Sequence, residues 1–266
     1  MPYVEVNGQR IHYQDSGGPG LPLVLAHGLL MDHEMFAPQV AAFGDRHRVV
    51  TWDERGHGLT ETTPDDFSYW DSADDLRGLL DALGIGRAVV GGMSQGGFVS
   101  MRFALRHPER VAGLVLIDTQ AGLEDPDALP RYEAMVDVWV TDGPSDLIAE
   151  ATAAIIIGPG RPESGPWMAK WKARPVDGVR QVFLTLVTRD DLTGRLGEIS
   201  APALVIHGEE DAAIDVWRAE ALVAGLPGAR PLVRVPGAGH ASNLTHPEPV
   251  NAAIGRFLDE LSARPA

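Results

Sequence analysis

The stretch that decides the fold of this chain is VVGGMSQGG, residues 89–97, in which Gly92, Ser94 and Gly96 form the pattern G-x-S-x-G. A β-branched run comes directly before the pattern, and apolar residues with helical spacing follow it over residues 96–106. A strand that turns at once into a helix needs small residues beside the turn, because bulky side chains would clash with the passing backbone. We therefore interpret Ser94 as a nucleophile exposed on a strained turn. The alternative is a glycine-rich turn with an incidental serine.

Further buried strands are predicted from short apolar runs that alternate with longer amphipathic stretches. Helical patterns such as residues 72–83 and 250–261 separate these runs, which indicates a parallel sheet covered by helices on both faces. Two more strands, residues 3–6 and 9–13, are joined by Asn7-Gly8, a strong hairpin signal, so this edge is expected to be antiparallel. The prediction is an α/β fold with a mostly parallel eight-stranded sheet. The other six strands are residues 22–26, 48–52, 88–91, 111–117, 202–206 and 231–235.

The strand pattern stops between residues 121 and 192, in a stretch that is rich in Asp, Pro, Gly, Trp and Ala. This stretch contains helical patches at residues 146–157 and 167–173, and a strand is predicted on either side of it. We therefore predict a core domain of residues 1–120 and 193–266, with a helical cap of residues 121–192 inserted over the sheet.

Three tryptophans of the predicted cap are candidates for the substrate pocket. Trp167 and Trp171 are four residues apart and share one face of a helix, and Trp139 adds a further ring. A cap over the strand ends lines the entrance to Ser94, where an open α/β sheet places its ligands. We expect an apolar pocket for small or medium uncharged acyl groups. The alternative is that these rings only dock the cap onto the sheet.

A serine nucleophile needs a base, and the base needs a carboxylate that orients it. Nine histidines are present, and His240 is the best candidate for the base. It lies in PGAGH, residues 236–240, a glycine loop that follows the last predicted strand. Such a loop can direct an imidazole back over the ends of the strands, toward Ser94.

The acid is expected after a strand and before the histidine in the chain. Asp211 meets both conditions, and the order serine, aspartate, histidine is the one expected for a nucleophile on such a turn. Asp118, at the end of the strand that follows the helix after Ser94, is the main rival. Glu209 and Glu210 are weaker rivals, because they precede the expected turn position.

Acyl transfer also needs N–H donors for the oxyanion that develops on the substrate. The loop HGLL, residues 27–30, follows a predicted strand, and we expect the backbone N–H of Leu29 to be one donor. The backbone N–H of Gln95, directly after the serine, is expected to be the other. The charged residues of DERGHG, residues 53–58, are expected to anchor a neighbouring loop rather than to act chemically.

With these pieces in place, the chain resembles the α/β-hydrolases of the serine esterase, 3-oxoadipate enol-lactonase and non-haem haloperoxidase (perhydrolase) group. The resemblance covers nearly the whole chain except the predicted cap, and GHASNL, residues 239–244, is especially similar to the enol-lactonase branch. It implies the α/β-hydrolase fold, a Ser-His-Asp triad that works without a cofactor, and a helical cap. Gln95 departs from the pattern, since many relatives carry Met or Leu there. The matching motifs are HG at residues 27–28, DERGHG at residues 53–58, G-x-S-x-G-G at residues 92–97, Asp211 and GH at residues 239–240.

The predicted reaction follows from the nucleophile. A serine alkoxide forms an acyl-enzyme, which suits esters and lactones, whereas attack on a saturated carbon needs a carboxylate nucleophile. We therefore predict a serine hydrolase that cleaves carboxylic esters or lactones through an acyl-enzyme intermediate. Three alternatives stay open: a perhydrolase or haloperoxidase-type activity on the same triad, a carbon–carbon bond hydrolase, and, most remotely, a non-catalytic ligand-binding module.

Composition and charge exclude several other classes. The chain carries 22 Lys+Arg against 37 Asp+Glu, a formal charge of −15 that repels phosphate backbones, so no nucleic-acid partner is expected. No apolar run is long enough for a membrane span, and MPYVEV, residues 1–6, shows no export signal, so a cytoplasmic location is expected. Cysteine is absent, and His207 with Asp211 lacks a convincing third ligand, so no metal is expected. No cofactor is expected either, because the resemblance implies none and Gly-rich phosphate loops of the Walker or dinucleotide type are absent. The expected partner is a small-molecule ester or lactone.

Overall fold

The computed structural model describes residues 2–60, 65–127, 129–174 and 178–263. Its sheet has eight strands in the order β1-β2-β4-β3-β5-β6-β7-β8. The pairs β1–β2 and β2–β4 are antiparallel and the other pairs are parallel, so the predicted mostly parallel sheet with an antiparallel edge is confirmed. The strands are β1 (Tyr3–Val6), β2 (Gln9–Asp15), β3 (Gly20–Ala26), β4 (His47–Trp52), β5 (Ala88–Met93), β6 (Val111–Ile117), β7 (Ala203–Gly208) and β8 (Val233–Val235).

Helices cover both faces of this sheet because successive strand residues point to opposite sides. Leu23 and Leu25 of β3 belong to the apolar cluster under α1 (Ala37–Phe43) and α10 (Pro247–Ser262). Val24 and Ala26 belong to the cluster on the other face, which also contains residues of α2 (Tyr69–Ala82), α3 (Gln95–Arg106) and α8 (Val216–Gly225). The other helical elements outside the predicted cap are short: α9 (Ser242–Thr245) and the 3₁₀ helices η1 (His33–Phe36), η2 (Pro108–Arg110) and η3 (Thr193–Glu198).

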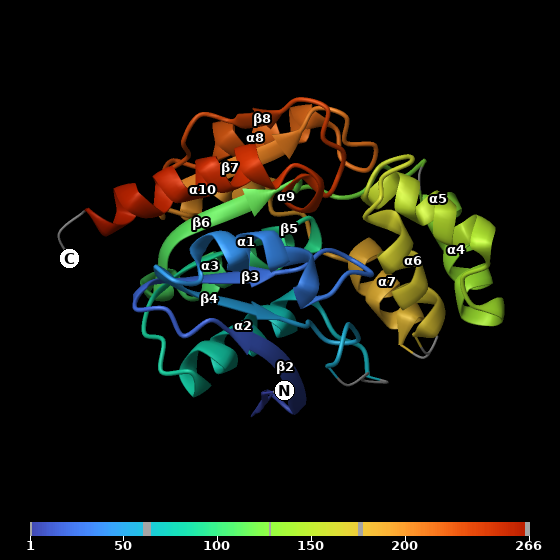
Figure 1. Cartoon of the computed structure of the whole chain (residues 1–266), viewed down its shortest axis with the longest axis horizontal. Helices are drawn as coiled ribbons and strands as arrows, with labels where there is room; N and C mark the ends of the chain where they lie inside the picture. The colour runs from blue at the N-terminus through green and yellow to red at the C-terminus, as the bar shows by residue number, and fades with distance from the viewer. Residues whose placement is uncertain (1, 61–64, 128, 175–177, 264–266) are drawn as a thin grey trace.

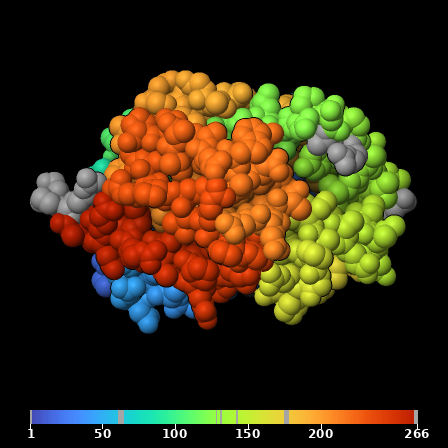
Figure 2. Space-filling view, turned by 90° about the horizontal axis from the view of Figure 1, so that it is seen from above, coloured from blue at the N-terminus to red at the C-terminus, as the bar shows by residue number. Residues whose placement is uncertain are grey.

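In the described part of the segment for which a cap is predicted, four helices lie between β6 and η3. They gather at one end of the molecule, beyond the strands (Figure 1), and the view from above shows their surface beside that of the C-terminal segment (Figure 2). We keep the name cap for these helices. Among the described residues, no helix combines the length and the apolar character that crossing a membrane requires. The cap helices are α4 (Leu129–Asp142), α5 (Asp146–Ile156), α6 (Ser164–Ala173) and α7 (Val179–Val187).

β3, β5 and α3 pack so closely at Gly92 and Gly96 that neither position has room for a side chain. A Cβ atom on Gly92 would lie 2.2 Å from the carbonyl oxygen of Ala26, and one on Gly96 would lie 1.9 Å from the same oxygen. Both contacts are with backbone of a central strand, which cannot move aside as a flexible side chain can. The G-x-S-x-G pattern is therefore a packing requirement as well as a turn requirement.

Replacing Gly96 by alanine tests this packing. Gly96→Ala should lower the free energy of unfolding by about 3 kcal/mol or more, because the added methyl group forces β3 and α3 apart. The control is Gly165→Ala on α6, where an added Cβ meets nothing within 4 Å. That variant should be neutral or more stable by up to about 1 kcal/mol. Urea unfolding measures both, and equal stabilities would contradict the packing argument.

Candidate active site

Ser94 occupies the turn between β5 and α3 in a conformation that is unusual for a residue with a side chain. Its backbone has φ 51° and ψ −111°, a combination that costs of order 1–3 kcal/mol. The surrounding chain holds it there: the Ser94 N–H donates to the carbonyl oxygen of Ile117 at 2.9 Å, and the Thr119 hydroxyl donates to the Ser94 carbonyl oxygen at 2.7 Å. The strain persists because β6 and the residues after it fix the turn from both sides.

His240 and Asp211 form a hydrogen-bonded pair at the ends of the strands. Nδ1 of His240 lies 2.8 Å from Oδ2 of Asp211, whose Oδ1 accepts the backbone N–H groups of Ala213 and Ile214 at 2.8 and 2.9 Å. The carboxylate is thereby fixed by its own turn, and it selects the imidazole tautomer that carries a proton on Nδ1. This leaves Nε2 of His240 free to accept a proton.

Ser94 and His240 line the same cavity. The two described side chains form no hydrogen bond with each other, a separation that is common in enzymes without bound substrate. The structure thus places the predicted acid and base in contact with each other. It places the predicted nucleophile on the wall of the cavity that the predicted base also lines.

The pKa values of the pair follow from burial and mutual attraction. Burial disfavours the imidazolium form of His240, but the charge and hydrogen bond of Asp211 outweigh this effect and raise the pKa of His240. For Asp211, burial favours the protonated form, yet attraction to His240 holds the pKa of the carboxyl below its usual value. The pair therefore favours a charged imidazolium, the species that forms when the base takes a proton.

Asp118, the rival acid, has a different environment. Its Oδ1 accepts the N–H of Gly208 at 2.8 Å and its Oδ2 accepts the N–H of Ser242 at 2.9 Å. Burial, together with repulsion from Asp211, raises the pKa of Asp118 to about 6. Asp118 therefore joins the end of β6 to the end of β7 and to the loop that carries His240, without a hydrogen bond to the imidazole.

The two predicted oxyanion donors come from a loop beside the cavity and from the start of α3. Leu29 lines the cavity, in a loop closed by a hydrogen bond from the Met31 N–H to the carbonyl oxygen of Gly28 at 3.0 Å. Gln95 is the first residue of α3, and its side chain is buried away from the cavity wall. The Tyr69 hydroxyl donates to Oε1 of Gln95 at 3.1 Å. Glutamine at this position, in place of the Met or Leu of many relatives, therefore changes the protein interior behind the turn rather than the cavity.

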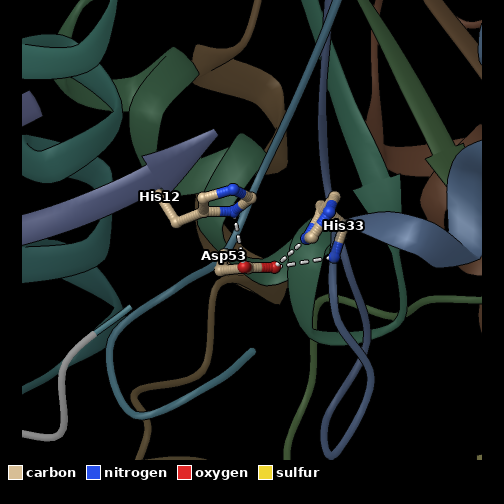
Figure 3. A group of neighbouring side chains, drawn as sticks. All are labelled: His12, His33 and Asp53. Carbon is tan, nitrogen blue, oxygen red and sulfur yellow. Dashed lines mark hydrogen bonds and ion pairs between the residues drawn. The ribbon is translucent and has the colours of Figure 1, made fainter. Parts of the chain in front are cut away.

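A fully buried carboxylate, Asp53, anchors the chain that follows the Leu29 loop. Its Oδ1 lies 2.8 Å from both the backbone N and Nδ1 of His33, and its Oδ2 lies 2.9 Å from Nδ1 of His12 and from the backbone N of Leu59. Figure 3 shows the two imidazole rings directed at the carboxylate. Burial opposes ionisation, but these donors hold the pKa of Asp53 well below its usual value. The role is structural, as predicted for the charged residues of DERGHG.

Among the residues that the structure describes, two groups of side chains have a geometry that could hold a metal ion. One is His12, His33 and Asp53, and the other combines His207 with Asp118 and Asp211. In both, carboxylate oxygens already accept N–H groups of the protein, so an ion would have to displace hydrogen bonds that join separate strands and loops. The donor sets are therefore better suited to anchoring than to binding a metal.

The cavity in front of Ser94 is lined by residues of the sheet domain and by residues of the cap. Trp139, Trp167 and Trp171, expected on its wall, are buried in the cap and do not line it. Trp171 donates from Nε1 to the Leu30 carbonyl oxygen at 2.8 Å, so it docks the cap onto the loop beside Ser94. The helical spacing identified a buried face but not the element it packs against. The cap residues that line the cavity are Tyr132, Met135, Thr152, Ile155, Ile156, Phe183 and Leu186.

Comparison with known proteins identifies the same fold and class. The model of the alpha/beta hydrolase fold family matches residues 22–158, and that of the TAP-like protein family matches residues 169–265. A thermophilic esterase from Thermogutta terrifontis, solved with malate bound, is 31% identical, with a TM-score of 0.91 over 99% of this chain and all of the other. The enol-lactonase from Burkholderia xenovorans is 28% identical, with a TM-score of 0.89 over 97% of this chain and all of the other. A 2-(acetamidomethylene)succinate hydrolase from Mesorhizobium japonicum is 29% identical over 91% of this chain and 89% of its own length.

Substitution of Asp211 and of Asp118 tests which of the two carboxylates is the acid. Asp211→Asn should lower kcat/KM for an ester by about a thousandfold or more, because the amide no longer stabilises the imidazolium or fixes its tautomer. Asp118→Asn should cost less than about tenfold in kcat/KM and act mainly on the melting temperature, because it breaks a clamp between strands. The reverse ranking of the two activities would move the acid to Asp118.

The pH dependence of kcat/KM provides a second test of the pair. The base acts as neutral imidazole, so activity should rise with pH through the pKa of His240 in the free enzyme. Because Asp211 raises this pKa, the midpoint should lie above the ordinary value of 6.5. Asp211→Asn should move the residual activity's midpoint to lower pH. A parent midpoint at or below 6.5 would contradict the assignment.

Proposed function

The chain belongs to the α/β-hydrolase family and is a hydrolase, and we propose that it cleaves carboxylic esters or lactones through an acyl-enzyme formed on Ser94. The observation that carries this proposal is the His240–Asp211 hydrogen bond of 2.8 Å, beside a cavity that His240 shares with a serine on a strained turn. A binding module has no need of an oriented imidazole facing a strained serine. The similarity to an esterase and to an enol-lactonase supports the same class of substrate.

The proposed reaction runs in two halves. Oγ of Ser94 attacks the substrate carbonyl carbon while Nε2 of His240 takes the hydroxyl proton, and Asp211 stabilises the resulting imidazolium. The backbone N–H groups of Leu29 and Gln95 stabilise the oxyanion, and the imidazolium then protonates the leaving alkoxide. In the second half His240 activates a water molecule, which attacks the acyl-enzyme and releases the acid and Ser94.

The cavity sets the size and polarity of the proposed substrate. Side chains such as Met135, Ile156, Phe183 and Leu186 give it an apolar wall. Burial of a substrate methylene against such a wall contributes about 0.8 kcal/mol, so small or medium acyl chains gain affinity from it. We therefore place the substrates among uncharged esters and lactones of modest size.

The decisive variant is Ser94→Ala, with Ser100→Ala as its matched control. Ser94→Ala should reduce kcat for an ester by at least about a thousandfold with native unfolding behaviour, because the nucleophile is lost and no core contact is removed. Ser100 lies on α3, the helix that follows Ser94, and is buried, with its hydroxyl donating to the Gly96 carbonyl oxygen at 2.7 Å. Its alanine variant should stay active. Full activity in Ser94→Ala would end the proposal.

A further inference from the structure

One acidic side chain faces the cavity in front of Ser94. Among the described residues that line it, Glu124 is the one carboxylate, and no lysine or arginine takes part. Glu124 lies in the segment between β6 and α4, outside the proposed triad and the oxyanion loop. The wall is largely apolar, with Ser94, Tyr132, Thr152 and His240 as its other polar members, and it carries one carboxylate and no lysine or arginine.

The cation that balances the charge of Glu124 is Arg189, which is not among the residues that line the cavity. Arg189 Nη2 is 2.9 Å from Oε1 of Glu124, and the side chains are 2% and 12% exposed, respectively. The guanidinium also donates to two backbone carbonyl groups and lies 4.4 Å from the ring centroid of Phe98, itself a lining residue. A ligand in the cavity would thus lie against Phe98 and Glu124, whereas Arg189 does not line the cavity.

The charge of Glu124 acts on the reacting centre. After burial, the groups that set the pKa of His240 are Asp211, Asp118 and Glu124, all of them carboxylates that favour the imidazolium. Asp211 is hydrogen-bonded to the imidazole, and Glu124 lines the same cavity as His240. A carboxylate on a substrate would meet no lysine or arginine on the cavity wall, and Arg189 is already paired with Glu124. The desolvation of that carboxylate would therefore have no free cation to compensate it.

We propose that Glu124 is a specificity-determining residue that makes the cavity select esters with uncharged acyl chains over esters whose acyl chain ends in a carboxylate. This inference rests on the proposed function, since it concerns the substrate class of the same site. The net charge of the protein disfavours anionic substrates only weakly and at long range. The inference assigns the discrimination between the two kinds of ester to the Glu124 side chain instead.

The test compares ethyl pentanoate with monoethyl glutarate, in which a carboxylate replaces the terminal methyl group of the acyl chain. The parent protein should show a kcat/KM for ethyl pentanoate that is about a hundredfold higher. Equal values for the two esters would overturn the inference and leave the hydrolase proposal standing. Failure to hydrolyse either ester, or any member of an ester and lactone panel, would overturn both.

Two variants assign the selectivity to Glu124. Glu124→Gln keeps the size of the side chain and should reduce the preference for the neutral ester by about tenfold, through a higher kcat/KM for monoethyl glutarate. Glu198→Gln removes one charge from an exposed pair with Arg195 and should leave the preference unchanged. An unchanged preference in folded Glu124→Gln would overturn the assignment. Comparison of the parent's two esters requires no variant and remains decisive if Glu124→Gln fails to fold.

Discussion

The site depends on one constraint, the backbone of Ser94, which turns from β5 into α3 at φ 51°. A residue with a side chain adopts this conformation only where its surroundings enforce it. Here the enforcement is mutual, because Gly92 and Gly96 allow β3 and α3 to pack against each other, and this contact fixes the turn. The proposed nucleophile is thus positioned by the packing of the central sheet rather than by a loop.

Buried carboxylates organise the loops around this turn. Asp53 accepts four N–H groups and fixes the chain that follows the Leu29 loop, and Asp118 accepts two and fixes the loop of His240. Asp211, the proposed acid, accepts backbone N–H groups on one oxygen and the imidazole on the other. Three similar side chains therefore differ in role according to their donors. Only Asp211 has a donor whose protonation state can change during the proposed reaction.

Some features of the fold and the site can be predicted from the sequence and others cannot, for physical reasons. Strands with continuous apolar runs, such as β6, and the hairpin at Asn7-Gly8 follow from local sequence, because burial on two faces and a tight turn each leave a clear pattern. The Asp211–His240 contact follows from topology, since both residues come after parallel strands that end at the same edge. The spacing of Trp167 and Trp171 predicts a shared helix face but not the partner of that face. Glu124 lies between elements, where no periodicity indicates its neighbours.

The central claim is that Ser94 becomes covalently bonded to the acyl group. A fluorophosphonate, which reacts with activated serines, followed by peptide mass spectrometry tests this claim most directly. The account predicts one phosphonyl group per chain, on the peptide that contains Ser94, with loss of esterase activity in proportion to labelling. An adduct on another serine that tracks the loss of activity, or complete labelling of Ser94 with activity retained, would contradict it.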